Sequence, residues 1–130
     1  MADTNTINLW PEFDLSETAP SSPKEVIAKA GAGLKDKTNG LVEFYPQRTT
    51  VSADRIELVF SLWVAALSYH YPFLNAQFPI KTFYPVQLVV DKFPAPFTAV
   101  DEPGLIAALT LVFNADTTKE TIQHLISLSR

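Results

Sequence analysis

The sequence predicts an α+β fold in which an antiparallel sheet of about four strands carries one N-terminal and two C-terminal helices on one face. Three observations support this fold class. Helical periodicity follows residue 22, alternation with a period of two dominates residues 41–90, and helical spacing returns after residue 101. Helical and strand stretches that are segregated in this way are typical of one helical layer packed on one sheet. A length of 130 residues is sufficient for a single domain.

Composition and charge exclude several classes of function. The chain has no cysteine, which excludes disulfides, zinc–thiolate sites and thiol catalysis. Ten Lys and Arg residues stand against fourteen Asp and Glu residues without a basic cluster, so we expect no nucleic-acid partner. The longest apolar run, residues 58–67, is far shorter than the roughly twenty residues that cross a membrane. Because no secretory signal is evident, we expect a cytoplasmic protein without a membrane partner.

The first 22 residues differ from the rest of the chain in charge. They contain four acidic residues and no Lys or Arg, and they end in an Ala-Pro-Ser-Ser-Pro run that marks a boundary. We therefore divide the chain into an acidic segment, residues 1–22, and a single α+β domain, residues 23–130. The segment also contains Trp10 and Phe13, and exposed aromatic side chains usually find a surface to cover. These two either fold back onto the domain or form a docking motif for another protein, with plain disorder as the third alternative.

The first helix is expected to begin after Ser22 and to end at Asn39-Gly40. Ser22 and Glu25 form a capping box around a proline at the first helical position, which satisfies two backbone amides. The Asn-Gly pair supplies the left-handed conformation that stops a helix. Gly31 and Gly33 weaken its interior by about 1 kcal/mol each, and such glycines often mark close packing of a helix on a sheet.

Four strands are expected, at residues 41–50, 55–64, 71–80 and 84–90. The first two form a hairpin. The second strand contains no proline and is expected to lie inside the sheet. Proline donates no hydrogen bond to a strand ladder, so the prolines in or beside the other runs must occupy edges, bulges or strand starts. These prolines are Pro46, Pro72, Pro79 and Pro85.

Residues 93–97 predict an ordered loop that is held by its two phenylalanines. Asp101-Glu102-Pro103 then opens a second helix, whose apolar residues lie on nearly every side and predict that it is mostly buried. A second capping box, Thr117-Thr118-Lys119-Glu120, predicts the start of the third helix.

Over residues 22–130 the chain resembles a family of small bacterial domains of unknown function. The resemblance lies in the order of four short pieces, residues 38–42, 84–86, 118–122 and 125–129, around a hairpin with an apolar second strand. Residues 69–84 depart from the family pattern. The resemblance implies no catalytic residues. It favours an accessory or interaction role, because members of the family occur both alone and attached to other domains.

The two histidines give no convincing catalytic or metal site. Metal sites need three or four converging ligands, and His124 has only a helical glutamate neighbour, which suits a surface ion pair equally well. His70 could form a hydrolytic triad only with distant residues, and no Gly-x-Ser-x-Gly turn is present. The available partners would be Ser61 or Ser68 with Asp54 or Asp91. We expect instead that His70 is structural and bonds to a backbone carbonyl, and we predict neither a cofactor nor a metal.

Aromatic residues are the remaining candidates for function. Those between residues 69 and 84 are either core residues or an interface, because aromatic side chains supply large contact areas in both. We predict a non-enzymatic accessory or protein-interaction domain that binds a protein partner or self-associates, for example as a homodimer. The alternative is a small-ligand-binding domain with a pocket between sheet and helices, where Gly31 and Gly33 leave space. The possible partner-binding residues are Trp10, Phe13, Tyr69, Tyr71, Phe73 and Tyr84.

Overall fold

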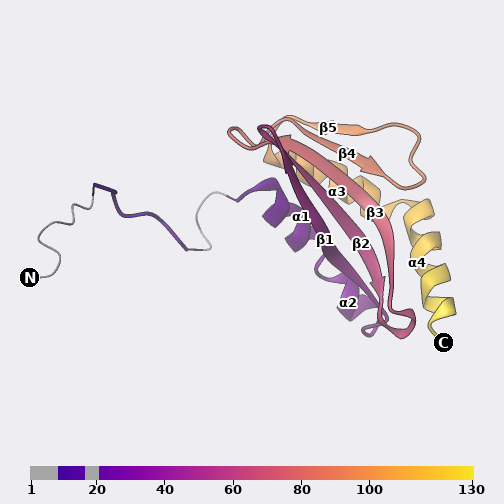
Figure 1. Cartoon of the computed structure of the whole chain (residues 1–130). Helices are drawn as coiled ribbons and strands as arrows, with labels where there is room; N and C mark the ends of the chain where they lie inside the picture. Colours follow the sequence, from indigo (N-terminus) through magenta and orange to yellow (C-terminus); the bar gives the residue numbers. More distant parts are fainter. Residues whose placement is uncertain (1–8, 17–20) are drawn as a thin grey trace, which may run out of the picture.

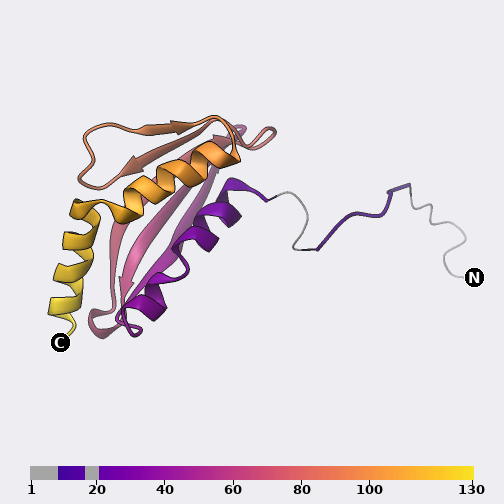
Figure 2. The same cartoon turned by 180° about the vertical axis from the view of Figure 1, so that it is seen from behind.

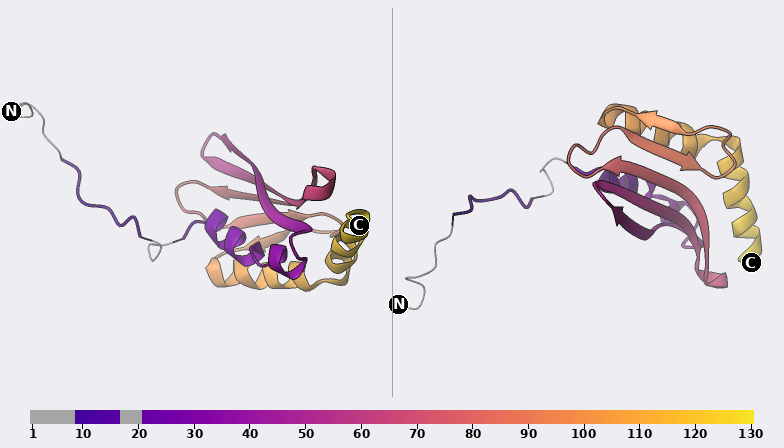
Figure 3. Two further views of the ribbon diagram at one scale, coloured as in Figure 1. Left: turned by 90° about the horizontal axis from the view of Figure 1, so that it is seen from below. Right: turned by 45° about the horizontal axis from the view of Figure 1, so that its top comes forward.

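The computed structural model describes residues 9–16 and 21–130 and shows an α+β domain with a five-stranded antiparallel sheet (Figure 1). The strands follow one another in the sheet as they do in the chain. All helices cover the same face of the sheet, as the view from below makes clear (Figure 3). The strands are β1 (Val42–Ser52), β2 (Arg55–Val64), β3 (Tyr69–Pro79), β4 (Val86–Val90) and β5 (Phe97–Ala99), and the helices are α1 (Pro23–Gly31), α2 (Leu34–Lys37), α3 (Glu102–Asn114) and α4 (Asp116–Leu128), with a 3-10 turn η1 (Ala65–Leu67) between β2 and β3.

The predicted fold class is confirmed, with five strands instead of about four. The additional strand is β5, which begins at Phe97, the last residue of the predicted loop. The rings of Phe93 and Phe97 do contact each other edge-to-face at 5.7 Å, as expected for an ordered loop. Residues 97–99 then continue into a pairing with residues 86–88 of β4. This short stretch contains no proline, so it can complete the ladder on the outer edge of β4.

Prolines occupy the irregular positions that the sequence required of them. Pro46 lies on the edge strand β1, where the register with β2 shifts. Pro72 lies beside the register shift between β2 and β3, at a point where β4 no longer pairs with β3. Pro79 ends β3 and Pro85 precedes β4. The proline-free strand β2 is paired on both sides, as predicted.

The expected first helix is divided into α1 and α2. Its start is confirmed: the Glu25 amide donates to Ser22 Oγ at 3.3 Å, and the Ser22 amide donates to Glu25 Oε1 at 3.2 Å. Its end is also confirmed, because residues 39 and 40 have positive φ angles of 54° and 82°. The interruption falls between the two glycines, Gly31 and Gly33, where helix propensity is weakest.

Two predictions about the C-terminal helices are wrong. Only one side of α3 is buried, because a single sheet can cover one face of a helix, and Leu111 on the other side is 65% exposed. The second capping box does not form. Helix α4 begins at Asp116 after the single extended residue Ala115, so Thr118 lies inside the helix and its hydroxyl donates to the Val112 carbonyl at 2.6 Å.

The hydrophobic core lies between the sheet and the helical layer. Its buried side chains come from α1, the inner faces of β1–β5 and the inner sides of α3 and α4, and all of them lie between residues 26 and 125. Residues 9–16 contribute none of them. Among the described residues, no helix is both long enough and apolar enough to cross a membrane.

Candidate interaction site

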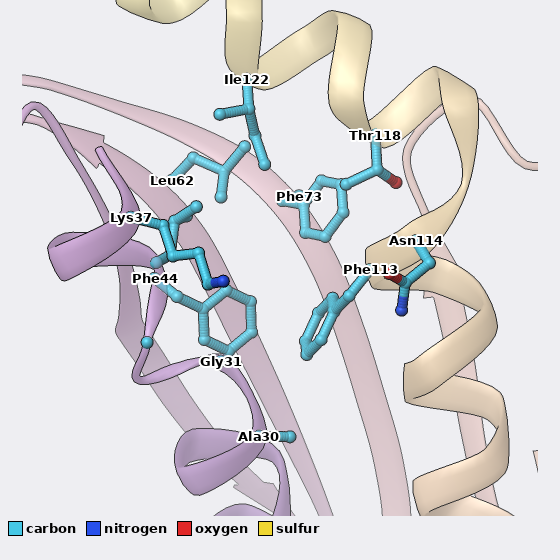
Figure 4. A pocket seen from close by; sticks show the side chains of 12 residues that line it. Ala30, Gly31, Lys37, Phe44, Leu62, Phe73, Phe113, Asn114, Thr118 and Ile122 are labelled. Carbon is cyan, nitrogen blue, oxygen red and sulfur yellow. The ribbon is translucent and has the colours of Figure 1, made fainter.

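A cavity of about 330 Å³ opens between the two arms of the helical layer. On one side it is bounded by the α1–α2 connection, and on the other by the junction of α3 and α4, while β1, β2 and β3 form its floor (Figure 4). Figure 2 shows how these helices are arranged on the sheet. We call it the helix–sheet cavity. Its large apolar side chains are Leu34, Phe44, Leu62, Phe73, Phe113 and Ile122.

The walls of the cavity depend on the close approach of α1 to Phe44. A Cβ atom added to Gly31 would lie 2.2 Å from Cδ2 of Phe44, so only glycine allows this contact. The Phe44 ring in turn stacks on Phe60 at 4.9 Å and meets Phe113 edge-to-face at 5.4 Å. Gly33 differs, because an added Cβ would meet nothing within 4 Å. Both glycines line the cavity, and the sequence pointed to both as a source of space.

The rim of the cavity combines one cation with polar groups that already have partners. Asn114 Nδ2 donates to the Thr110 carbonyl at 2.9 Å, and the Thr118 hydroxyl donates to a backbone carbonyl. Lys37, which belongs to α2, lines the opposite side of the cavity and is exposed to solvent. An apolar floor beside an ammonium group suits a ligand in which an apolar group lies next to a negative charge.

The outward face of α3 continues from this cavity as an apolar surface. Ile106, Ala107, Thr110 and Leu111 are all exposed, and the spacings 106/110, 107/110 and 107/111 of three or four residues place them on one side of the helix. We call these four residues the α3 strip. The Thr110 hydroxyl donates to the Ile106 carbonyl at 2.8 Å, which removes its proton from the surface. The whole of α3 has one charged residue, Glu102 in its first turn, and its last residue, Asn114, lines the cavity.

The described part of the N-terminal segment presents its aromatic residues to solvent. Trp10 is 76% exposed and Phe13 is 64% exposed, so they do not fold back into the core in this structure. Their ring centroids are 6.4 Å apart. The segment leads away from the domain (Figure 1). Hydrogen bonds from the side chain and backbone of Ser16 lower the pKa of the Asp14 carboxyl, which keeps this acid ionised.

The four aromatic candidates between residues 69 and 84 do not form one surface. Phe73 is buried and forms part of the cavity floor, whereas Tyr69 is exposed at the start of β3. The Tyr71 hydroxyl donates to Asp91, and burial is the main cause that raises the pKa of Tyr71 to about 12. Tyr84 is half-buried, and its pKa is raised chiefly by burial and further by the acids at the start of α3.

His70 is held by a side-chain hydrogen bond and two aromatic neighbours. Its Nδ1 lies 2.8 Å from Ser61 Oγ, so its partner is a side-chain hydroxyl and not the backbone carbonyl that we expected. The rings of Trp63 and Tyr45 flank it on the uncovered face of the sheet, with centroids at 4.4 Å and 5.3 Å. Ser61 is fully buried, which leaves its oxygen no route to a substrate.

The other elements of a triad or metal site are not brought together. Asp91, one of the two candidate acids, is bonded to Tyr71. Within residues 9–16 and 21–130, no three side chains of the types that bind metals converge on one point.

Sequence reasoning missed the α3 strip because an apolar pattern on all sides of a helix predicts burial. One signal in the sequence could have revealed it. The helix has almost no charge, and the one predicted sheet can cover only one of its sides. Comparison with family models, curated proteins and solved structures gives no match to this chain, so the resemblance to small bacterial domains stays a prediction.

Proposed function

We propose that this chain is a non-enzymatic protein-interaction domain that binds an extended apolar segment along the α3 strip. The observation that carries the proposal is the uncharged, exposed face of α3. A helix that is apolar on all sides is normally buried, and contiguous apolar surface on a soluble domain marks an interaction site. A partner that covers Ile106 and Leu111 would remove this surface from water.

The helix–sheet cavity supports the proposal as the place for an anchoring side chain. Binding energy at interfaces is concentrated in a few large side chains that fill pockets. The cavity of about 330 Å³ lies beside the last turn of α3, so an extended segment on the strip reaches it directly. Lys37 at the rim favours a segment that carries an acidic residue next to its anchor.

Site-specific crosslinking tests this function, because a chain without cysteine accepts a single label at any chosen position. Leu111→Cys, modified with a benzophenone maleimide, places a photoreactive group on the strip. Gln123→Cys is the matched control, since Gln123 is exposed on α4 and lies outside the strip and the cavity lining. We expect a discrete crosslinked product in an extract of the source cells from position 111 and none from position 123.

A second substitution shows whether that product reports the strip. Adding Ile106→Arg to the Leu111→Cys chain places a charge on the strip about one and a half turns away and should abolish the crosslinked product at position 111. Because residue 106 is exposed, the urea midpoint of the double variant should stay close to that of Leu111→Cys alone. Equal crosslinking at positions 111 and 123, or a product that survives Ile106→Arg, would contradict the proposed function.

A small-ligand-binding domain is the second candidate, and the three-sided enclosure of the cavity favours it. Its volume lies at the lower end of the range for small-molecule pockets, roughly 300–1,000 Å³. Anilinonaphthalene sulfonate combines an aromatic body with one negative charge and serves as the probe. We expect saturable fluorescence enhancement that Gly33→Leu removes and Gly33→Ala retains. Enhancement that Gly33→Leu leaves unchanged would place the probe elsewhere and contradict this candidate.

A further inference from the structure

We infer that the extended segment bound at this site is residues 9–16 of a second copy of the chain, with Trp10 as the side chain in the helix–sheet cavity. This inference rests on the proposed function, because it names the partner of the same site. It is carried by two properties of the described residues, the apolar content of the segment and the opposite charges of segment and site, together with the position of residues 9–16 away from the domain (Figures 1 and 2).

The segment has the composition that the site requires. Four of its eight residues, Leu9, Trp10, Phe13 and Leu15, are large and apolar, and all are strongly exposed. Trp10 and Phe13 lie close enough for their rings to approach at 6.4 Å, so they present one aromatic cluster. Tryptophan is the residue type most enriched among anchors that dominate interface energies. A single tryptophan with smaller apolar neighbours matches one cavity that continues into a shallow apolar strip.

The charges of the two surfaces are complementary. Residues 9–16 contain two acids, Glu12 and Asp14, and no base. On the other side, α1 and α2 contain four lysines and only two acidic residues. Lys37 lies at the cavity rim itself. Opposite charges at a rim increase the rate of association and set the orientation of the bound segment.

The position of residues 9–16 favours a second copy over the same domain. Ser22 is extended, with φ −73° and ψ 160°, and leads into a proline that fixes the start of α1. Residues 9–16 lie away from the helical layer in both views of the whole chain (Figures 1 and 2). Two copies that exchange their segments satisfy both cavities and close as a symmetric dimer.

Molar mass from light scattering tests the dimer with full-length protein. We expect wild type to show twice the mass of the 14.4 kDa chain. Trp10→Ala should weaken the dimer roughly 30-fold or more, the effect typical of removing an interface anchor. Gly33→Leu should do the same by filling the cavity from a position where an added Cβ meets nothing within 4 Å. Gly33→Ala is the matched control and should remain dimeric.

Mixing the two defective chains identifies the contact itself. The Trp10→Ala chain keeps an intact cavity, and the Gly33→Leu chain keeps an intact segment. An equimolar mixture can form one of the two exchanged contacts, so we expect a 1:1 complex at concentrations where each variant alone is monomeric. Far-UV circular dichroism of each variant confirms that its domain is folded. Trp10 lies outside the core, so its substitution leaves the fold intact.

Failure of this inference is distinguishable from failure of the proposed function. A wild-type chain that is monomeric at every concentration overturns the exchange of segments. A dimer that persists in Trp10→Ala or in Gly33→Leu also overturns it, because the dimer then uses another surface. In either case, selective crosslinking at position 111 still decides whether the α3 strip binds a different protein. If the equimolar mixture of the Trp10→Ala and Gly33→Leu chains shows only the mass of a monomer, that result likewise contradicts the contact between segment and cavity.

Discussion

Replacing Gly31 by alanine tests the packing that forms the helix–sheet cavity. The added Cβ would lie 2.2 Å from Cδ2, 2.5 Å from Cγ and 2.7 Å from Cε2 of Phe44. Real Cβ contacts of this kind lie beyond 3 Å, so the ring must move by the order of 1 Å or α1 must lift from the sheet. The ring has little freedom to move, because it is buried and stacked on Phe60 at 4.9 Å.

The magnitude follows from two opposing effects. Alanine has a higher helix propensity than glycine by about 1 kcal/mol, which alone would stabilise the protein. Overpacking a well-ordered core is destabilising by about 1–3 kcal/mol, and disturbing an aromatic pair adds about 0.5–1.5 kcal/mol. We therefore expect Gly31→Ala to lower the free energy of unfolding by about 1–3 kcal/mol. Gly33→Ala, two residues away in open space, should stay within about 1 kcal/mol of wild type.

Urea denaturation followed by circular dichroism measures both effects, and a double-mutant cycle isolates the clash. Phe44→Leu removes most of the ring that the new methyl group meets. In that background Gly31→Ala should be neutral or stabilising, so the two substitutions are coupled by about 1–3 kcal/mol. The reasoning is refuted if Gly31→Ala stabilises the wild-type protein, or if its effect is the same with and without the Phe44 ring.

Three further predictions concern single side chains. Ser22→Ala removes one half of the capping box and should lower the free energy of unfolding by about 1 kcal/mol in urea titrations; an unchanged midpoint would show that α1 does not depend on this cap. His70→Ala leaves the buried Ser61 hydroxyl without its partner and should destabilise by about 1–3 kcal/mol; unchanged thermal stability would contradict the structural role. Tyr71 has a pKa of about 12 in the folded protein against the usual 10.0 of a tyrosine, so its protonated form stabilises the fold below pH 10, and this contribution is lost as pH rises toward 12. Tyr71→Phe should lose less stability than wild type across that interval in unfolding experiments at each pH, and parallel pH profiles of the two proteins would contradict this.

The candidate site was predictable in part, and the reasons differ from residue to residue. Gly31 and Gly33 indicated space between helix and sheet because glycine in a helix interior needs a packing reason. Phe73 was predicted either as core or as interface, and it forms the buried floor of the cavity. Tyr84 and Tyr69 were grouped with it because they are close in sequence. A sheet separates such neighbours by alternating faces and by turns, so closeness along the chain does not place side chains on one surface.

The sequence by itself determined those features that depend on near neighbours along the chain. The capping box at Ser22, the stop at Asn39-Gly40 and the alternation of β2 are of this kind, because each involves hydrogen bonds or side-chain periods within a few residues. Proline positions also followed from local chemistry, since a missing N–H restricts the residue wherever the strand lies.

Only the tertiary structure decided which apolar surfaces are covered. Leu105 and Leu111 are equally apolar and lie on the same helix, yet Leu105 is fully buried and Leu111 is exposed. The difference depends on the single sheet beneath α3 and on the absence of a second layer above it within the described residues. The same is true of the helix–sheet cavity, whose lining comes from seven segments between Ala30 and Ile122 that meet only when the layers pack. Burial is a property of the assembled layers, and periodicity along one helix reports only which residues could be buried.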